Sequence, residues 1–198
     1  KHYHRVKIEI NLDNQLIDLN SENIDLGIRI GRPKDSSLRA RKLLTNRTWL
    51  CASPDYLAHS PPPLRPEELI DHNCLLLTQD RQITHWYFKK GKEKIKIPVT
   101  GNLSSKGGTP LLEAALNGGG IVQMSQWMML DLINKNQLAV CLPDWESSLH
   151  EDTSGEVYAV YLGNKFLRPV LREFIDFLVE KLEIRIRDLN DRHHKVVS

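Results

Sequence analysis

Hydroxyl groups, glycines and one lysine cluster at residues 104–109. The residues there that could contact a ligand are Ser104, Ser105, Lys106, Gly107 and Thr109. Backbone amides at the start of a helix that follows would join the serine hydroxyls in binding a small anion. Covalent catalysis is not indicated, because Ser105 and Lys106 are adjacent and adjacent strand residues point to opposite faces. The stretch predicts one wall of a ligand pocket, and a plain connection between two elements is the alternative.

A strand, a turn and a helix must position these groups. Apolar residues end at Leu103, and apolar positions at helical spacing resume over residues 111–116. Thr109 has N-cap chemistry, Pro110 suits the first helical position and Gly118 would end the helix. The turn therefore presents the first amides of the helix at one point.

Other kinds of chemistry find little support in the sequence. There is no Gly-x-Ser-x-Gly elbow, no phosphate-binding P-loop and no His-Glu-x-x-His, and the histidines are scattered. Cys51, Cys74 and Cys141 lie far apart in apolar runs, which is typical of reduced core thiols. We expect no enzyme activity, no cofactor and no metal site.

Composition is that of an ordinary soluble globular chain. The chain has 198 residues, of which 40% are hydrophobic and 26% charged, with a net charge of +2. This charge gives no basis for a nucleic-acid surface. No apolar run is long enough to cross a bilayer and the first residues do not resemble a signal peptide, so we expect a cytoplasmic protein without a membrane partner.

Hydrophobic periodicity predicts alternating strands and helices. Strands are expected at residues 6–12, 24–30, 43–52, 75–78, 85–88, 95–100, 120–124, 138–142 and 157–162. Helices are expected near 16–19, 53–58, 66–71, 110–116, 126–135 and 167–187, with a fraying tail at 190–198. The first strand, helix and strand predict a parallel βαβ unit. Such a unit normally has a further strand and helix before Val6, which we expect to be absent from this sequence.

A second wall of the pocket is expected where strands end. Arg32, Ser36 and Ser37 follow the strand at 24–30, at the carboxyl edge where open α/β sheets bind ligands. Gln123 and Ser125 end a later strand and face the pocket if the molecule has two lobes. Arg29 either faces that pocket or pairs with an internal carboxylate.

Several stretches, taken together and in order, resemble the effector-binding domain of LysR-type transcriptional regulators. They are Asp25-Leu26-Gly27-Ile28-Arg29-Ile30-Gly31 with Asp35-Ser36-Ser37-Leu38, then Leu50-Cys51-Ala52-Ser53-Pro54-Asp55-Tyr56-Leu57, the glycine-bounded helix at 106–121, and the closing helix at 169–178. The match covers nearly the whole chain.

The resemblance implies an α/β, two-lobed, periplasmic-binding-protein-like fold with two crossover strands, whose N-terminal strand and helix are missing here. The crossings would fall near residues 49–53 and 157–162. Lobe I would comprise residues 1–52 and 162–198, and lobe II residues 53–161. The family's N-terminal winged helix-turn-helix, through which these regulators contact DNA, is absent from the chain.

The resemblance also implies the partners. A small-molecule effector would lie between the lobes, near Ser53 if that residue is not simply a helix cap. Where the family often has Asn-Asp, this chain has Lys106-Gly107, which favours an anionic effector unless Lys106 points to solvent. A homodimer or tetramer would pair Ile8 and Ile10 of one subunit with the central helix of another, whose contact residues are Leu112, Glu113 and Leu116.

The expected function is therefore sensing of a small molecule by part of a DNA-binding regulator. A free two-lobed solute-binding protein of the same build is the alternative, and a small-molecule enzyme is a third.

Overall fold

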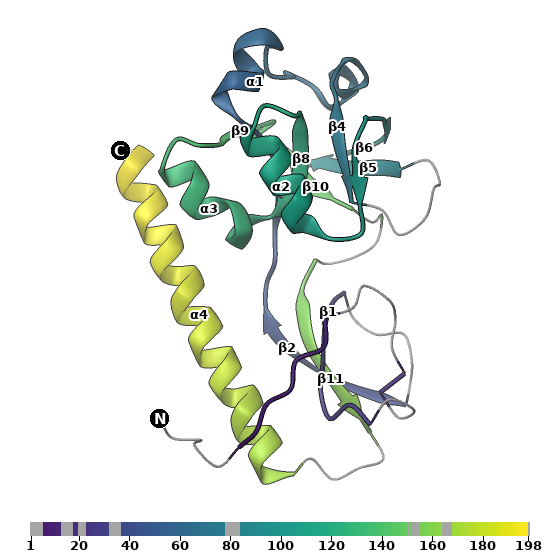
Figure 1. Cartoon of the computed structure of the whole chain (residues 1–198), viewed down its shortest axis with the longest axis vertical. Coiled ribbons are helices and arrows are strands. Elements are labelled where there is room, and N and C mark those ends of the chain that lie inside the picture. The colour runs from purple at the N-terminus through teal and green to yellow at the C-terminus, as the bar shows by residue number, and fades with distance from the viewer. Residues whose placement is uncertain are drawn as a thin grey trace.

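The computed structural model describes residues 6–12, 18–19, 23–31, 37–77, 84–149, 151, 155–163 and 168–197, with the side chains of the last helix described at 169–184 and 187. The expected mixed α/β architecture is confirmed. The strands form two separate sheets, one in each half of the molecule (Figure 1).

The larger sheet forms the upper half in Figure 1. Its strand order is β6-β5-β10-β3-β8-β4-β7, and β9 pairs with β3. The strands are β3 (Thr48–Ala52), β4 (Cys74–Leu77), β5 (Thr84–Lys90), β6 (Glu93–Val99), β7 (Ser104–Ser105), β8 (Ile121–Ser125), β9 (Ala139–Cys141) and β10 (Glu146–Ser148). Four helical segments surround it: α1 (Pro54–His59), the 3-10 helix η1 (Pro66–Asp71), α2 (Gly108–Leu116) and α3 (Gln126–Asn134).

Alternation along β8 gives this sheet two different faces. Val122 and Met124 point to the face covered by α2, where Leu111 and Ala115 are fully buried. Ile121 points to the other face and joins a core around Trp86. The apolar side of α2 therefore packs on the face of β8 that carries Val122 and Met124.

The smaller sheet has three antiparallel strands in the order β1-β11-β2. They are β1 (Gly27–Ile30), β2 (Leu38–Leu44) and β11 (Val157–Leu162). The long helix α4 (Pro169–Val197) covers one face of it, with Ile175 buried in a core that contains Leu43 and Ala159. Farther along, α4 contacts α3 of the other half (Figure 1).

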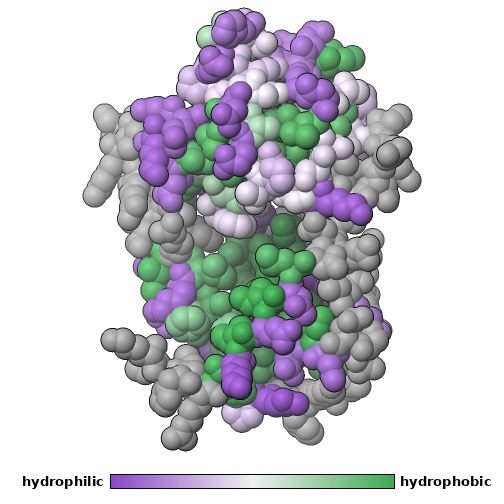
Figure 2. Space-filling model, viewed as in Figure 1, coloured by the Kyte–Doolittle hydropathy of each residue, from purple (hydrophilic) through white to green (hydrophobic). Residues whose placement is uncertain are grey.

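The chain passes twice between the two sheets. Residues 45–47 connect β2 to β3, and residues 149–156 connect β10 to β11. The single strand expected at 43–52 is thus interrupted by the first of these crossings. In Figure 2 the surface is hollowed between the two halves, and apolar atoms gather below the hollow.

Several predicted elements are confirmed. The hairpin of β5 and β6, the helices α2 and α3, and the strands β8 and β11 lie where periodicity placed them. Residues 16–17 of the expected short helix lie outside the described part of the chain.

Three expectations were wrong. Residues 6–12 form no strand, and Val6, Ile8, Ile10 and Leu12 are 40%, 58%, 74% and 94% exposed. An alternating pattern becomes a strand only when a neighbouring strand completes its hydrogen bonds, and no described strand pairs with these residues. The parallel βαβ unit is also absent, because β1 pairs antiparallel with β11.

The third error concerns the chain's last residues. Helix α4 continues to Val197, where a fraying tail was expected from residue 190. Residues 188–197 contain neither glycine nor proline, so nothing in the sequence ends the helix earlier.

Candidate functional site

The turn between β7 and α2 lies at the edge of the larger sheet. Gly107 is the N-cap of α2, two residues before the expected Thr109, and no side chain caps the helix. The Ser105 hydroxyl instead accepts a hydrogen bond from the Gly107 amide at 3.1 Å. The first-turn amides that follow are thus left without a side-chain partner, the arrangement that favours a bound anion.

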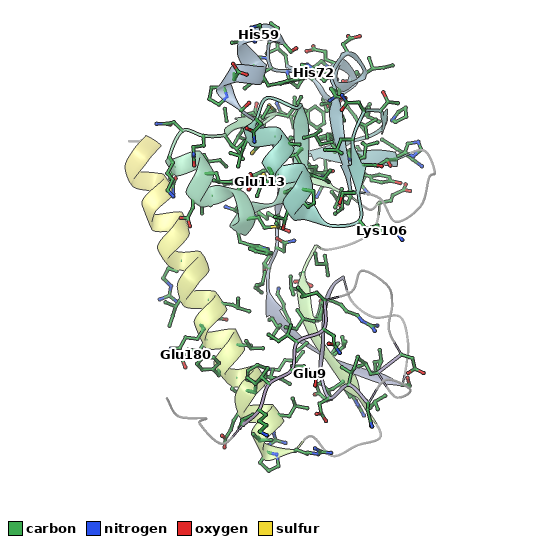
Figure 3. All side chains as sticks on the ribbon, in the orientation of Figure 1. Glu9, His59, His72, Lys106, Glu113 and Glu180 are labelled. Atoms are coloured by element: carbon green, nitrogen blue, oxygen red, sulfur yellow. The ribbon has the colours of Figure 1, made fainter. Side chains whose placement is uncertain are left out.

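Close packing fixes the position of this turn. A Cβ atom on Gly108 would lie 2.4 Å from Cε of Met124, so a larger residue there would have to displace the end of the Met124 side chain. Ser104, Lys106 and Thr109 are exposed. Figure 3 shows Lys106 at the lower edge of the upper half, beside the gap between the two halves.

A second polar group occupies the end of the larger sheet nearest the crossings. Gln123 and Ser125 are 1% and 8% exposed, and both lie on the face of β8 opposite α2. Strand register places Ser125 opposite Thr48, and Thr48 opposite Ser147. Asn46 completes the group and is 5% exposed.

Five residues make up this group, which we call the amide cluster (Asn46, Thr48, Gln123, Ser125 and Ser147), and their hydrogen bonds form two sets. Asn46 Nδ2 donates to Ser125 Oγ at 3.0 Å. Gln123 Nε2 donates to Thr48 Oγ1 at 3.4 Å. The Thr48 hydroxyl donates to the Ser147 carbonyl at 2.5 Å.

Sequence reasoning missed Asn46, Thr48 and Ser147. The available signal was their position in the chain: Asn46 and Thr48 belong to a short polar stretch, residues 45–48, between two apolar segments, and Ser147 lies where no strand or helix was expected. A polar residue within a run of buried strand residues is the pattern that marks such a cluster.

At the same end, the smaller sheet has a row of three polar side chains, which we call the charged row (Arg29, Lys42 and Tyr158). Register aligns Arg29 of β1, Tyr158 of β11 and Lys42 of β2. The Tyr158 hydroxyl donates to Glu156 at 2.5 Å, and Lys42 forms an ion pair with the same carboxylate. Polar groups of both sheets therefore lie toward the residues at which the chain crosses between them.

Two of the other predicted contacts, Ser53 and Ser37, are not brought to this place. Ser53 is buried and caps α1 by accepting from the Tyr56 amide at 3.3 Å, at the end of β3 away from Thr48. Ser37 precedes β2, at the opposite end of the smaller sheet from the crossing. Arg32 and Ser36 lie outside the described residues.

The expected dimer residues lie as follows. Glu113 is exposed on α2, and Leu112 and Leu116 are half-buried beside it (Figure 3 labels Glu113). Ile8 and Ile10 are exposed in the lower half of the molecule.

Burial disfavours the thiolate form of the three cysteines. It raises the pKa of Cys74 to about 12 and that of Cys141 to about 11, and it also raises the pKa of Cys51. Cys51 and Cys141 are on neighbouring strands, but they face opposite sides of the sheet because the strand partner of Cys141 is Leu50. All three cysteines are free.

The described residues offer neither a metal-binding group nor a membrane-spanning helix. They contain no group of three or more His, Cys, Asp or Glu side chains placed to hold a metal ion. Within the same part of the chain, no helix has the length and apolar character that a membrane span requires.

Comparison with known proteins gives consistent results. Residues 1–183 match the family model of the LysR substrate binding domain. The chain is 34% identical over 188 residues to the transcriptional activator TtdR of Escherichia coli K12, covering 94% of this chain and 58% of TtdR. It is 31% identical over 180 residues to the transcriptional regulator CrgA of Neisseria meningitidis, covering 91% of this chain and 58% of CrgA.

Solved structures show the same similarity. The full-length Vibrio cholerae virulence activator AphB, a member of the LTTR protein family, superposes with a TM-score of 0.75 at 28% identity, covering 91% of this chain and 59% of AphB. The CrgA regulatory domain superposes with a TM-score of 0.69 at 31% identity, covering 82% of this chain and 78% of that domain. The chain thus spans less than two thirds of its full-length relatives.

Proposed function

Because the chain belongs to the LysR substrate-binding domain family, we propose that it senses a small-molecule effector for a LysR-type transcriptional regulator in the cytoplasm. Its fold is the periplasmic-binding-protein-like fold of the family's regulatory domains. The relatives are transcriptional regulators and not enzymes, which favours a sensor without catalytic activity and does not favour a free solute-binding protein.

One observation carries the proposal: the uncapped turn of α2, the amide cluster and the charged row of the smaller sheet all lie toward the junction of the two sheets. A ligand held there would contact both halves and stabilise one relative arrangement of them. In this proposal lobe I comprises residues 1–52 and 162–198, and lobe II residues 53–161. The proposed contacts are Ser104, Ser105, Lys106, Gly107, Thr109, Gln123 and Ser125.

The effector is proposed to be anionic. Lys106 is exposed at the edge of the junction, next to the first-turn amides of α2, and both features favour negative charge. DNA would be contacted by a part of the regulator beyond this chain, since this chain spans 58% of TtdR and CrgA. The regulator would act as a homodimer or tetramer.

A thermal-shift screen tests the proposal. The chain would be heated with small carboxylates, phosphorylated metabolites and neutral aromatic compounds, and a compound that binds the junction should raise the Tm. Lys106→Gln should reduce the shift caused by an anionic compound, whereas Lys135→Gln, at the far end of α3, should not. If no compound of any class raises the Tm, or if both variants respond as the wild type does, the proposed site is wrong.

A further inference from the structure

The side chain of Gln123 has a hydrogen-bond acceptor with no partner. Its Oε1 atom is buried and makes no hydrogen bond, in a residue that is 1% exposed. The neighbouring hydroxyl fixes which way the carboxamide points. Thr48 Oγ1 has a single hydrogen, which it donates to the Ser147 carbonyl at 2.5 Å, so it can only accept from Gln123 Nε2. The oxygen of Gln123 is therefore the end that is left unpaired.

Asn46, which lies on the same side of the sheet, also has a buried carboxamide oxygen without a partner. Its Nδ2 atom donates to Ser125 Oγ, and its buried Oδ1 atom has no partner. Ser125 lies two residues after Gln123 on β8, so both carboxamides approach the same patch of the sheet. Thr48 and Ser147 are only partly buried and form the accessible side of the cluster.

Two unpaired oxygens at one place are unusual in a folded protein. Nearly all buried polar atoms are hydrogen-bonded, because an unpaired one costs about 1–3 kcal/mol in desolvation. A binding site can contain such unpaired atoms, because the bound ligand supplies their missing hydrogen-bond partners. Two carboxamide oxygens accept hydrogen bonds, so a ligand that pairs with both must carry two hydrogen-bond donors.

We propose that the effector is hydroxylated, with hydroxyl groups that donate to Gln123 Oε1 and Asn46 Oδ1. This inference rests on the proposed function, since it concerns the ligand of the same junction. Hydroxyls are favoured over an ammonium group because the five side chains of the amide cluster include no carboxylate, and a buried cation without a countercharge is costly. Together with the uncapped amides of α2, the cluster selects a hydroxylated acid over its deoxy analogue.

The first test needs no ligand. Gln123→Met keeps the length of the side chain and removes the unpaired oxygen, so the Tm without ligand should stay unchanged or rise by roughly 2–4 °C. Thr48→Val is the matched control, because it removes a hydroxyl whose hydrogen bonds are made, and it should lower the Tm. If Gln123→Met lowers the Tm as much as Thr48→Val does, the oxygen already has a partner, such as a buried water, and the proposal is overturned.

The second test uses pairs of acids with the same carbon chain, namely glycerate with propionate and gluconate with hexanoate. In the wild type the hydroxylated member of a pair should raise the Tm more than the deoxy member, and Gln123→Met should abolish that difference while keeping the response to the deoxy acid. Equal responses within both pairs would overturn the proposal and leave a carboxylate-binding junction, and so the proposed function, intact. If none of the four acids raises the Tm, hydroxylated acids are rejected, and the broader screen decides the proposed function separately.

Discussion

At the scale of single residues, a tyrosine, a histidine and an asparagine tie the start of β4 to α1. The Tyr56 hydroxyl accepts from the Asn73 amide at 3.1 Å and lies 3.1 Å from Nδ1 of His72. A neutral imidazole that accepts the Tyr56 hydrogen at Nδ1 fits this geometry. Burial lowers the pKa of His72 below 6.5, while Asp71 and Glu68 oppose this shift.

This arrangement predicts a loss of stability in mild acid. Between about pH 7.5 and about pH 5.5 the unfolded chain protonates His72 before the folded chain does, so the free energy of unfolding should fall as the pH falls through that window. Urea unfolding at the two pH values measures the fall, which should be smaller in His72→Asn. His59→Asn, at an exposed position on α1, is the control. An equal fall in wild type and His72→Asn would contradict the role of His72.

At the scale of elements, Asn73 links β4 to the segments that lead into β7 and β8. Its Nδ2 atom donates to the Gly119 carbonyl at 2.5 Å and to Asn102 Oδ1 at 2.8 Å, and its Oδ1 atom accepts from the Asn102 amide at 2.9 Å. These bonds hold both ends of the region that contains α2. They therefore help to position the turn at Gly107.

Removing this link should destabilise the protein. Asn73→Ala leaves backbone groups of Asn102 and Gly119 without their partner, and we expect the free energy of unfolding to drop by about 2–3 kcal/mol. Asn117→Ala is a matched control, because the exposed Asn117 donates only to the Glu113 carbonyl at 2.8 Å and should cost less than about 1 kcal/mol. Denaturant unfolding of both variants gives the comparison, and similar losses would show that Asn73 is not a structural link.

Sequence patterns predicted local elements well and long-range pairing poorly. The spacing of Leu111, Ala115 and Val122 was sufficient to find α2 and β8, because burial of one face repeats along each element. The N-cap is Gly107 and not Thr109, and the first residue of α2 packs against Met124, a tertiary contact that local sequence patterns do not reveal. The amide cluster could not be derived, since it depends on the register of β3 against β8 and β10.

At the scale of the whole molecule, two sheets and a bridging helix define the architecture. The two-part arrangement was expected only through the family resemblance, because no pattern in the sequence indicates which strands share a sheet. The position of the proposed ligand site follows from that arrangement: Gln123 lies on β8 on one side of the junction, and Tyr158 lies on β11 on the other.

The proposed dimer can be tested at this scale. Glu113→Lys reverses a charge on the exposed side of α2, so it should disrupt a contact between this helix and the segment around Ile8 and Ile10 of another subunit. Sedimentation velocity should then show a monomer where the wild type is dimeric. Glu173→Lys, on the exposed side of α4, should leave the dimer intact. An unchanged sedimentation coefficient for Glu113→Lys would argue against this interface.

The two places where the backbone passes from one sheet to the other have a mechanical consequence. Residues 45–47 are a very short tether, and Gly155 lies beside it at the second passage, since a Cβ atom on Gly155 would be 2.7 Å from the Asn46 carbonyl oxygen. Any movement of one half against the other would therefore strain the backbone least about the line through these two passages. Helix α4 packs on the smaller sheet and contacts α3, so a movement that separates α4 from α3 would lose that contact.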